Sequence, residues 1–389
     1  MASEESVALP LIDGLPQRPD NYDYLKILKD FLGGDFSKVF AGKVVYPRQL
    51  EIHLPGDHKR PCDFDCYYCQ GGLLKRPLGM DEPKVLRLLE DIGPAKCEYH
   101  IFGGAYTEPL LNPYLMDFLR VTKRLKVSFG IHTNGSRLKN LEEEKGFLTE
   151  LFMLMDKKDY LSVSLDAGTP ESHMKTKNLK VNHFDTIIEG IAMACALQKK
   201  NPQRPAVRIC YLMNSVNSSE EEIARMVRIA KELGVDSLRF SIPYDQYGKP
   251  FARVRDYKQK VEIPQNLVYE QRLKKFYSHS PDDKPYIFYF PPFNQDVDRM
   301  NYRHCVYTYY QTTLAADGNM YRCSSIATPS FLFGKLGAIP DNRKEFERLL
   351  ISSQGSDFNC DRCFKAHARC NRLALEINSA YNAAHDLPI

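Results

Sequence analysis

The chain alternates between short segments with one polar and one apolar face and longer stretches with apolar residues at helical spacing. Residues 81–93, 112–125 and 218–235 are examples of the helical stretches, and the last opens with serine and glutamate residues and closes at Gly234, as helices commonly do. Six segments have the period-two alternation of strands, at 49–54, 98–104, 126–135, 160–168, 206–214 and 237–242. Strands and helices in alternation predict a parallel sheet with right-handed crossovers.

The two faces of each predicted strand differ in polarity. Strands of a parallel sheet that helices cover on both sides are usually apolar throughout. In the fourth strand, however, one face carries Leu161, Val163 and Leu165 and the other carries Ser162, Ser164 and Asp166. A closed eight-stranded barrel fills its interior with branched apolar side chains. Six polar faces therefore predict an α/β fold, a partial (β/α)6 TIM-like barrel around a wet lumen. An antiparallel sheet with one solvated face is the alternative, and it fits the intervening helices poorly.

Composition narrows the class of protein. The chain has 389 residues, of which 43% are hydrophobic and 26% charged, which is typical of globular proteins. The net charge of +4 is small for this length, so nucleic acid is not a favoured partner. No apolar run is long enough to span a membrane, and residues 1–20 lack the pattern of a secretory signal. We therefore expect a cytoplasmic, reducing location, where eleven cysteines indicate ligands, catalytic groups or core thiols rather than disulfides.

Three cysteines lie close together after the first predicted strand. The segment PCDFDCYYCQGG at 61–72 contains Cys62, Cys66 and Cys69, in a loop where barrel enzymes place their chemistry. Three thiolates can hold three irons of a [4Fe–4S] cluster and leave the fourth iron open. The CxxxCxxC spacing, with Tyr68 before the last cysteine, resembles the signature of the radical S-adenosylmethionine (SAM) superfamily. A zinc knuckle completed by His53 or His58 is the alternative.

The resemblance implies an enzyme with an iron–sulfur cluster and SAM as cofactors. In this family the reduced cluster passes an electron to SAM, and the resulting 5′-deoxyadenosyl radical abstracts a hydrogen atom from the substrate. The cofactors carry that chemistry and the protein orients them.

The loop after the second strand resembles the Gly-Gly-Glu motif of the same family. In FGGAYTEPLLNP at 102–113, Gly103 and Gly104 let the backbone approach a ligand closely. Glu108 is expected to accept a hydrogen bond from the ammonium of SAM. The sequence departs from the tight family pattern by inserting residues 105–107 before Glu108.

Further SAM ligands are implied on the inward faces of later strands. Asn134 lies in HTNGS, which resembles the Thr-Asn-Gly turn of the family. Ser164 and Asp166 resemble ligands of the ribose hydroxyls, and Asn214 resembles the polar group that supports the adenosyl portion. Arg208 faces the lumen and is expected to pair with the SAM carboxylate or with a substrate anion. Each residue alone is equally compatible with an ordinary lumen lining, but their common face favours a cofactor site.

A second set of cysteines lies near the C-terminus. The spacing CX12GX4C, followed by a distant CxxC, is formed by Cys305, Gly318, Cys323, Cys360 and Cys363. On spacing alone, zinc and an iron–sulfur cluster are equally compatible with four thiolates. The pattern resembles the auxiliary-cluster region of the SPASM and Twitch subfamilies, which implies one auxiliary [4Fe–4S] cluster. Cys370 is either a core thiol or an alternative ligand.

Four segments are predicted from these patterns. They are an N-terminal extension at 1–45, a radical SAM partial barrel at 46–245, a connecting region at 246–300 and a Twitch-like domain at 301–389. The N-terminal segment is short for a module that binds a leader peptide. This favours a small-molecule substrate over a peptide.

We therefore expect oxidation or epimerisation of a small natural-product or sugar-like substrate. Cys210 faces the lumen and would return a hydrogen atom in an epimerisation, whereas the auxiliary cluster would accept an electron in an oxidation. Glu51, His53, Arg239 and Ser241 are candidate substrate contacts by their facing, and an electron donor such as flavodoxin or ferredoxin is implied. The alternatives are a peptide-modifying enzyme that forms thioether or carbon–carbon crosslinks, and a zinc-stabilised binding module.

Overall fold

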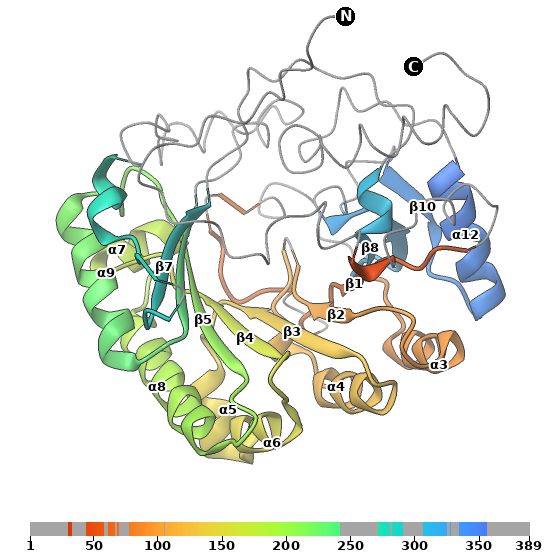
Figure 1. Cartoon of the computed structure of the whole chain (residues 1–389), viewed down its shortest axis with the longest axis horizontal. Helices are drawn as coiled ribbons and strands as arrows, with labels where there is room; N and C mark the ends of the chain where they lie inside the picture. The colour runs from red at the N-terminus through yellow and green to blue at the C-terminus, as the bar shows by residue number, and fades with distance from the viewer. Residues whose placement is uncertain are drawn as a thin grey trace, which may run out of the picture.

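The sheet of this protein is curved, with helices along its outer side (Figure 1). The computed structural model describes residues 30–32, 44–57, 61–66, 68–69, 78–104, 106–241, 271–280, 282–290, 306–324, 327 and 334–355. Within these residues, ten strands form one sheet in the order β10-β9-β8-β1-β2-β3-β4-β5-β6-β7. The mostly parallel sheet confirms the predicted α/β fold class.

All six predicted strands are present and pair in sequence order. They are β1 (Gln49–Ile52), β2 (Tyr99–Phe102), β3 (Ser128–Thr133), β4 (Tyr160–Ser164), β5 (Ala206–Leu212) and β6 (Ser237–Ser241). Each is parallel to its neighbour. Because their carboxyl ends lie at one edge of the sheet, the loops that follow the strands meet there.

Seven helices of the described chain connect these strands. They are α3 (Glu82–Ile92), α4 (Leu115–Arg124), α5 (Leu138–Lys145), α6 (Phe147–Leu154), α7 (Pro170–Lys177), α8 (Phe184–Lys200) and α9 (Glu220–Leu233). The predicted helix signals are real caps: the Ser219 side chain accepts a hydrogen bond from the Glu222 backbone, and Gly234 ends α9 with a φ of 72°. No described helix is long and apolar enough to cross a membrane.

The predicted facing of the strands is confirmed. Leu161 and Val163 of β4, and Val207 and Ile209 of β5, are completely buried, as expected for the side that packs against helices. Their neighbours on the other face, such as Ser162 and Arg208, line an internal cavity. Register therefore follows the hydrophobic pattern, since a shift of one residue would exchange the two faces.

Strands from later in the chain extend the sheet at both ends. On one side β7 (Tyr286–Phe290) pairs in parallel with β6. On the other side β8 (Gln311–Leu314) pairs in parallel with β1 and forms an antiparallel hairpin with β9 (Asn319–Tyr321). The antiparallel β10 (Lys335–Ala338) follows, and the chain continues into α12 (Arg343–Gly355). Short 3-10 turns occur at Pro109–Leu111, Lys274–Phe276 and Val306–Tyr309.

The β8–β9 hairpin packs closely against the segment that follows the cysteine loop. Gly79 and Met80 donate backbone hydrogen bonds to the Ala316 carbonyl, at 2.8 and 3.1 Å. Gly318, the glycine of the second cysteine pattern, has a φ of 81°, and a Cβ at this position would lie 2.6 Å from the Gly79 carbonyl oxygen. The turn and the close approach both require glycine here.

Candidate active site

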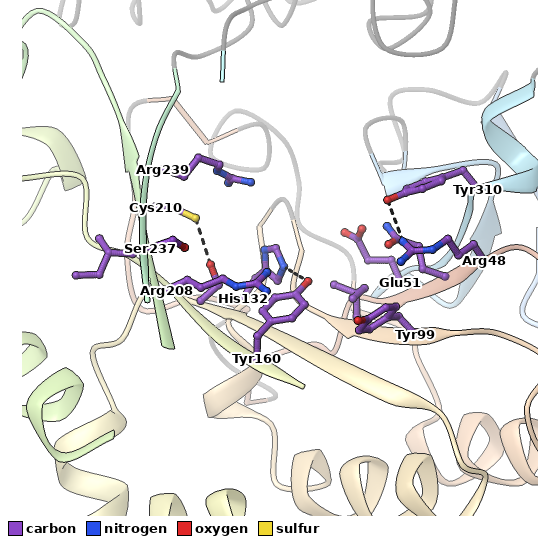
Figure 2. A pocket seen from close by; sticks show the side chains of 14 residues that line it. Arg48, Glu51, Tyr99, His132, Tyr160, Arg208, Cys210, Ser237, Arg239 and Tyr310 are labelled. Atoms are coloured by element: carbon purple, nitrogen blue, oxygen red, sulfur yellow. Dashed lines mark hydrogen bonds between the residues drawn. The ribbon is translucent and has the colours of Figure 1, made fainter. Parts of the chain in front are cut away.

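The inner face of the sheet encloses a cavity of about 210 Å³ (Figure 2). Side chains from all six central strands reach it: Glu51 from β1, Tyr99 from β2, His132 from β3, Ser162 from β4, Cys210 from β5 and Arg239 from β6. Arg48 and Tyr310 close one side, where the Arg48 guanidinium donates to the Tyr310 hydroxyl at 3.2 Å. A lumen lined largely by polar side chains, as the polar strand faces predict, is thus present.

Arg208 places a positive charge in this cavity. Its guanidinium carbon lies 4.2 Å from the centroid of the Tyr160 ring, a cation–π contact. The Tyr160 hydroxyl in turn lies 2.9 Å from Nε2 of His132. No carboxylate within the described residues forms an ion pair with Arg208, unlike Arg48, which pairs with Glu98 at 2.7 Å. Arg208 is therefore available to a bound anion.

Cys210 points into the same cavity. Its Sγ lies 3.2 Å from Oγ of Ser162 on the neighbouring strand, and 9% of the residue is exposed. Figure 2 shows the Cys210 thiol above the Arg208 side chain. The predicted candidate hydrogen-atom donor and the cation thus face one space.

The loop with Cys62, Cys66 and Cys69 is bound to the ends of β2 and β3. The backbone amide of Glu108 donates to the Pro61 carbonyl at 2.9 Å. The side-chain amide nitrogen of Asn134 donates to Asp63 Oδ1 at 2.7 Å and lies 3.7 Å from the sulfur of Cys62. The cysteines are consequently held at the carboxyl end of the sheet, as the sequence predicted.

The cysteine thiols fit a metal cluster better than they fit free thiolates. Burial raises the pKa of the Cys62 thiol, and the nearby Glu108 carboxylate raises it further. Burial also raises the pKa of the Cys66 thiol to about 12. A coordinated metal deprotonates such thiols outright. The described His, Cys, Asp and Glu side chains include no group of three arranged around a single ion, whereas a cubane takes each thiolate on a different iron.

Glu108 is almost completely buried and joins two loops. Its Oε1 accepts from the Leu110 amide at 3.1 Å and from the Thr133 hydroxyl at 2.6 Å, and Oε2 accepts from the Asn134 amide at 2.7 Å. Burial raises the pKa of this carboxyl to about 7 against these hydrogen bonds. A carboxylate offers about four acceptor positions, so its role towards the SAM ammonium stays a prediction beside a clear structural role.

The glycines of the second loop lie where a side chain does not fit. A Cβ on Gly104 would lie 2.2 Å from the Thr107 hydroxyl oxygen and 3.1 Å from the His53 ring, and one on Gly103 would lie 3.0 Å from the His132 Cβ. His53 itself is buried, and its Nε2 bonds to Glu51 at 2.7 Å. Close packing against these side chains therefore requires glycine at both positions, and the SAM contact of this loop stays a prediction.

Two other predicted SAM ligands have unused polar groups. The side-chain nitrogen of Asn214 is completely buried and has no hydrogen-bond partner in the described part of the chain. Ser164, at the end of β4, is half-buried, and its hydroxyl makes no hydrogen bond to other described residues. Buried polar groups are normally satisfied, so an unpartnered amide at this position fits a bound ligand.

Asp166 differs from Asn214 and Ser164, because hydrogen-bond donors of the protein already contact both of its carboxylate oxygens. Its Oδ1 accepts from the Leu212 amide at 2.6 Å, and its Oδ2 accepts from the Tyr68 hydroxyl at 2.5 Å and from the buried ammonium of Lys177. The ribose contact predicted for Asp166 stays a prediction. Lys177 was missed by sequence reasoning, since a lysine at a helix end is usually solvated.

The second cysteine set lies mostly outside the described residues. Cys323, directly after β9, is buried, but Cys305, Cys360, Cys363 and Cys370 belong to the part of the chain that the structure does not describe. The auxiliary cluster therefore stays a prediction. Cys195, on the buried face of α8, is 1% exposed and is a core thiol.

Comparison with known proteins agrees with this geometry. Residues 58–227 match the model of the radical SAM superfamily. A curated SAM-dependent nucleotide dehydratase of Lacinutrix mariniflava is 30% identical over 124 residues, which cover 30% of this chain and 24% of that protein. This chain thus spans about a quarter of that relative's length.

Solved structures share the fold. SuiB of Streptococcus suis, bound to SAM, has a TM-score of 0.55 at 15% identity, over 75% of this chain and 64% of SuiB. The structure of anSMEcpe with bound SAM has a TM-score of 0.52 at 16% identity, over 87% of this chain and 94% of that one. At such identities the likeness shows the fold alone. By the family match and the cysteine loop, residues 58–227 resemble a radical SAM domain, from a family whose cofactors are a [4Fe–4S] cluster and SAM.

Proposed function

We propose that this protein is a radical SAM enzyme that oxidises or epimerises a small anionic substrate in the cavity between Arg208 and Cys210. The observation that carries the proposal is the Arg208 guanidinium, which lies on the Tyr160 ring inside the lumen with no carboxylate partner in the described chain. A guanidinium binds carboxylate or phosphate through two parallel hydrogen bonds. The substrate class therefore carries one of these groups.

The size of the cavity favours a small molecule over a peptide. Its volume of about 210 Å³ lies below the range of roughly 300–1,000 Å³ that is usual for drug-sized ligands. The curated relative is named for a nucleotide substrate, which is a phosphorylated small molecule, so dehydration of a nucleotide is a second candidate reaction. Modification of a peptide would need most of the substrate to lie outside this cavity.

The residues of this chain have distinct roles in the proposal. Cys62, Cys66 and Cys69 hold the cluster, and Gly103, Gly104, Ser164 and Asn214 contact SAM. When bound and reduced by one electron at the cluster, SAM supplies the radical that takes a hydrogen atom from the substrate. Arg208 fixes the substrate anion so that one C–H bond of the substrate faces SAM, and positioning of this kind provides much of an enzyme's rate.

In an epimerisation, Cys210 supplies the returning hydrogen. The S–H bond of Cys210 breaks homolytically, a C–H bond forms on the opposite face of the substrate radical, and a thiyl radical remains on Cys210. One electron from an external donor such as flavodoxin or ferredoxin, with one proton, restores the thiol. The 3.2 Å contact between Cys210 Sγ and Ser162 Oγ fixes the thiol in the cavity.

In an oxidation, Cys210 is not required. Cys305, Cys323, Cys360 and Cys363 would hold an auxiliary cluster that would accept one electron from the substrate radical. Glu51, the carboxylate in the cavity lining, would accept the proton. A double bond or carbonyl then forms in the substrate. We place this chemistry in the reducing cytoplasm, where such clusters persist.

The substrate proposal is tested by binding to anaerobically reconstituted enzyme. Sugar phosphates, nucleotides and sugar carboxylates are titrated calorimetrically against wild type, Arg208→Met and a control, Arg225→Gln, which alters an exposed ion pair on α9. We expect a phosphorylated or carboxylated ligand whose affinity falls at least tenfold in Arg208→Met and is unchanged in Arg225→Gln. Binding only of neutral ligands or of peptides would contradict the proposal.

The reaction type is tested once a substrate is found. Product formed in deuterium oxide by wild type and Cys210→Ala is analysed by mass spectrometry. Epimerisation predicts one deuterium at carbon in the wild type and loss of turnover to the epimer in the variant. A product two hydrogens lighter in both proteins identifies an oxidation, and a product lighter by one water identifies a dehydration.

A further inference from the structure

A completely buried lysine lies beside the cysteine loop. Lys177 is the last residue of α7 and is 2% exposed, the one lysine of the described chain in the core. Its ammonium donates to the Asp166 carboxylate and, at 2.5 Å, to the Tyr68 hydroxyl. The same ammonium lies 5.3 Å from the centroid of the Tyr68 ring. Because Tyr68 stands between Cys66 and Cys69, the ammonium lies against the cluster-binding loop.

Asp166 fixes this lysine from the side of the sheet. Its backbone has a φ of 56°, its Oδ1 accepts from the Leu212 amide at 2.6 Å, and its carbonyl accepts from the Asn217 side chain at 2.7 Å. The carboxylate is thus held between β4 and β5, and Lys177 extends between it and the loop. A buried ammonium persists only with such a partner.

Holding Tyr68 in place does not require the lysine. The Tyr68 hydroxyl donates directly to Asp166 at 2.5 Å, so the loop is already tied to the end of β4. What Lys177 adds at this position is a positive charge in a site of low dielectric. Charges act strongly in such surroundings, because little water is present to screen them.

Tyr68 brings the Lys177–Asp166 pair against the cluster-binding loop. Its hydroxyl donates to Asp166 and accepts from Lys177, each at 2.5 Å. The Lys177 ammonium also lies over the face of the Tyr68 ring. An ammonium paired with a carboxylate keeps its proton, so a positive charge lies against the segment that carries Cys66 and Cys69.

We propose that Lys177 sets the reduction potential of the cluster held by Cys62, Cys66 and Cys69. When the cluster accepts one electron from an external donor it gains one negative charge, and the ammonium stabilises that state without losing its proton. Nearby charges and hydrogen bonds are known determinants of cluster potentials. The inference rests on the radical SAM assignment of the cysteine loop and is independent of the substrate.

The test is a redox titration of the reconstituted protein without SAM or substrate, followed by electron paramagnetic resonance. Lys177→Met removes the charge, Lys177→Arg keeps it, and Asp166→Asn removes the counter-charge. Lys175→Met is the matched control, because Lys175 is exposed on the same helix and pairs with Glu171. The triple alanine variant of the three cysteines supplies the signal of any second cluster for subtraction.

We expect Lys177→Met to lower the potential, so that the ratio of reduced to oxidised cluster at a fixed potential falls on the order of tenfold, or 59 mV for one electron. Lys177→Arg should stay near wild type, Asp166→Asn should shift the potential upwards, and Lys175→Met should not change it. If Lys177 and Asp166 had only a structural role, Lys177→Met and Asp166→Asn would leave the reduction potential unchanged or shift it in the same direction.

An unchanged potential in Lys177→Met overturns the proposal. If iron and sulfide analysis shows that Lys177→Met assembles no cluster, Asp166→Asn decides: a potential at or below that of wild type overturns the proposal, and a higher one supports it. Because no substrate takes part, a failure of the substrate proposal leaves this result unaffected.

Discussion

Replacement of Gly104 by alanine tests whether the loop after β2 forms the SAM contact. The new Cβ would lie 2.2 Å from the Thr107 hydroxyl oxygen and 3.1 Å from the His53 ring. Real Cβ contacts are essentially never shorter than 3.0 Å, so either Thr107 must rotate or the loop must move. Thr107 and His53 are both buried, at 7% and 0% exposure, which leaves little room for either.

The expected magnitude follows from this overlap. Forcing an extra methyl group into packed surroundings costs about 1–3 kcal/mol. If the loop relieves the strain by moving into the space of the ligand, the affinity for SAM falls about 5- to 150-fold, since each 1.4 kcal/mol is about tenfold. The double variant Gly104→Ala, Thr107→Ala removes the shortest contact and should recover most of the affinity.

Calorimetric titration of SAM into the reconstituted protein measures the effect, with thermal unfolding as a parallel readout of stability. Gly337→Ala is the control, because a Cβ there would make only ordinary contacts at 3.5 Å with Leu349. The reasoning is refuted if Gly104→Ala binds SAM as tightly as the wild type, or if the second substitution restores nothing.

Three further predictions concern stability and SAM binding. Burial lowers the pKa of His100 to about 3, so below pH 6.5 the unfolded chain binds a proton that the folded chain does not. The free energy of unfolding therefore falls with falling pH, by about 2 kcal/mol between pH 7 and 5. In His100→Asn this part of the urea-unfolding pH dependence should disappear, whereas replacing the exposed His279 should leave it intact. Gly318→Ala should destabilise the chain by about 2 kcal/mol or more, because the φ of 81° disfavours a side chain and the new Cβ would lie 2.6 Å from the Gly79 carbonyl oxygen. An unchanged melting temperature would contradict this. Ser164→Ala should leave the melting temperature unchanged and weaken SAM binding about 2- to 10-fold, because its hydroxyl bonds to no other described residue; equal SAM affinity would remove Ser164 from the site.

The central strands were predictable because one face of each is polar. A period of two fixes which residues point inward, so the sequence alone predicts Arg208, Cys210 and Arg239 in the lumen. The cysteine loop was predictable from spacing, since its three thiols stand in one short segment. Both signals lie within short segments of the chain, so they can be recognised from the sequence without knowledge of the tertiary contacts.

Other features have no local signal. The strand β8 consists of Gln311, Thr312, Thr313 and Leu314, and all four are buried. A short polar segment gives no sign of such burial. β7 reads YIFYF, which has no polar face and therefore no period. Lys177 stands at a helix end, and it is held in the core by Asp166 and Tyr68, which lie 11 and 109 residues away in the sequence.

The position of β8 links the C-terminal part of the chain to β1 and to the segment after the cysteine loop. It pairs with β1 over the residues Gln49–Ile52, and its hairpin accepts hydrogen bonds from Gly79 and Met80, just beyond the cysteine loop. Tyr310, immediately before β8, closes the cavity beside Arg48. The segment from 306 onwards therefore completes both the sheet and the cavity. The predicted boundary at 301 marks a change of sequence pattern. The cavity lined by Arg208 and Cys210 is nevertheless built from both sides of that boundary, because Tyr310 also lines it.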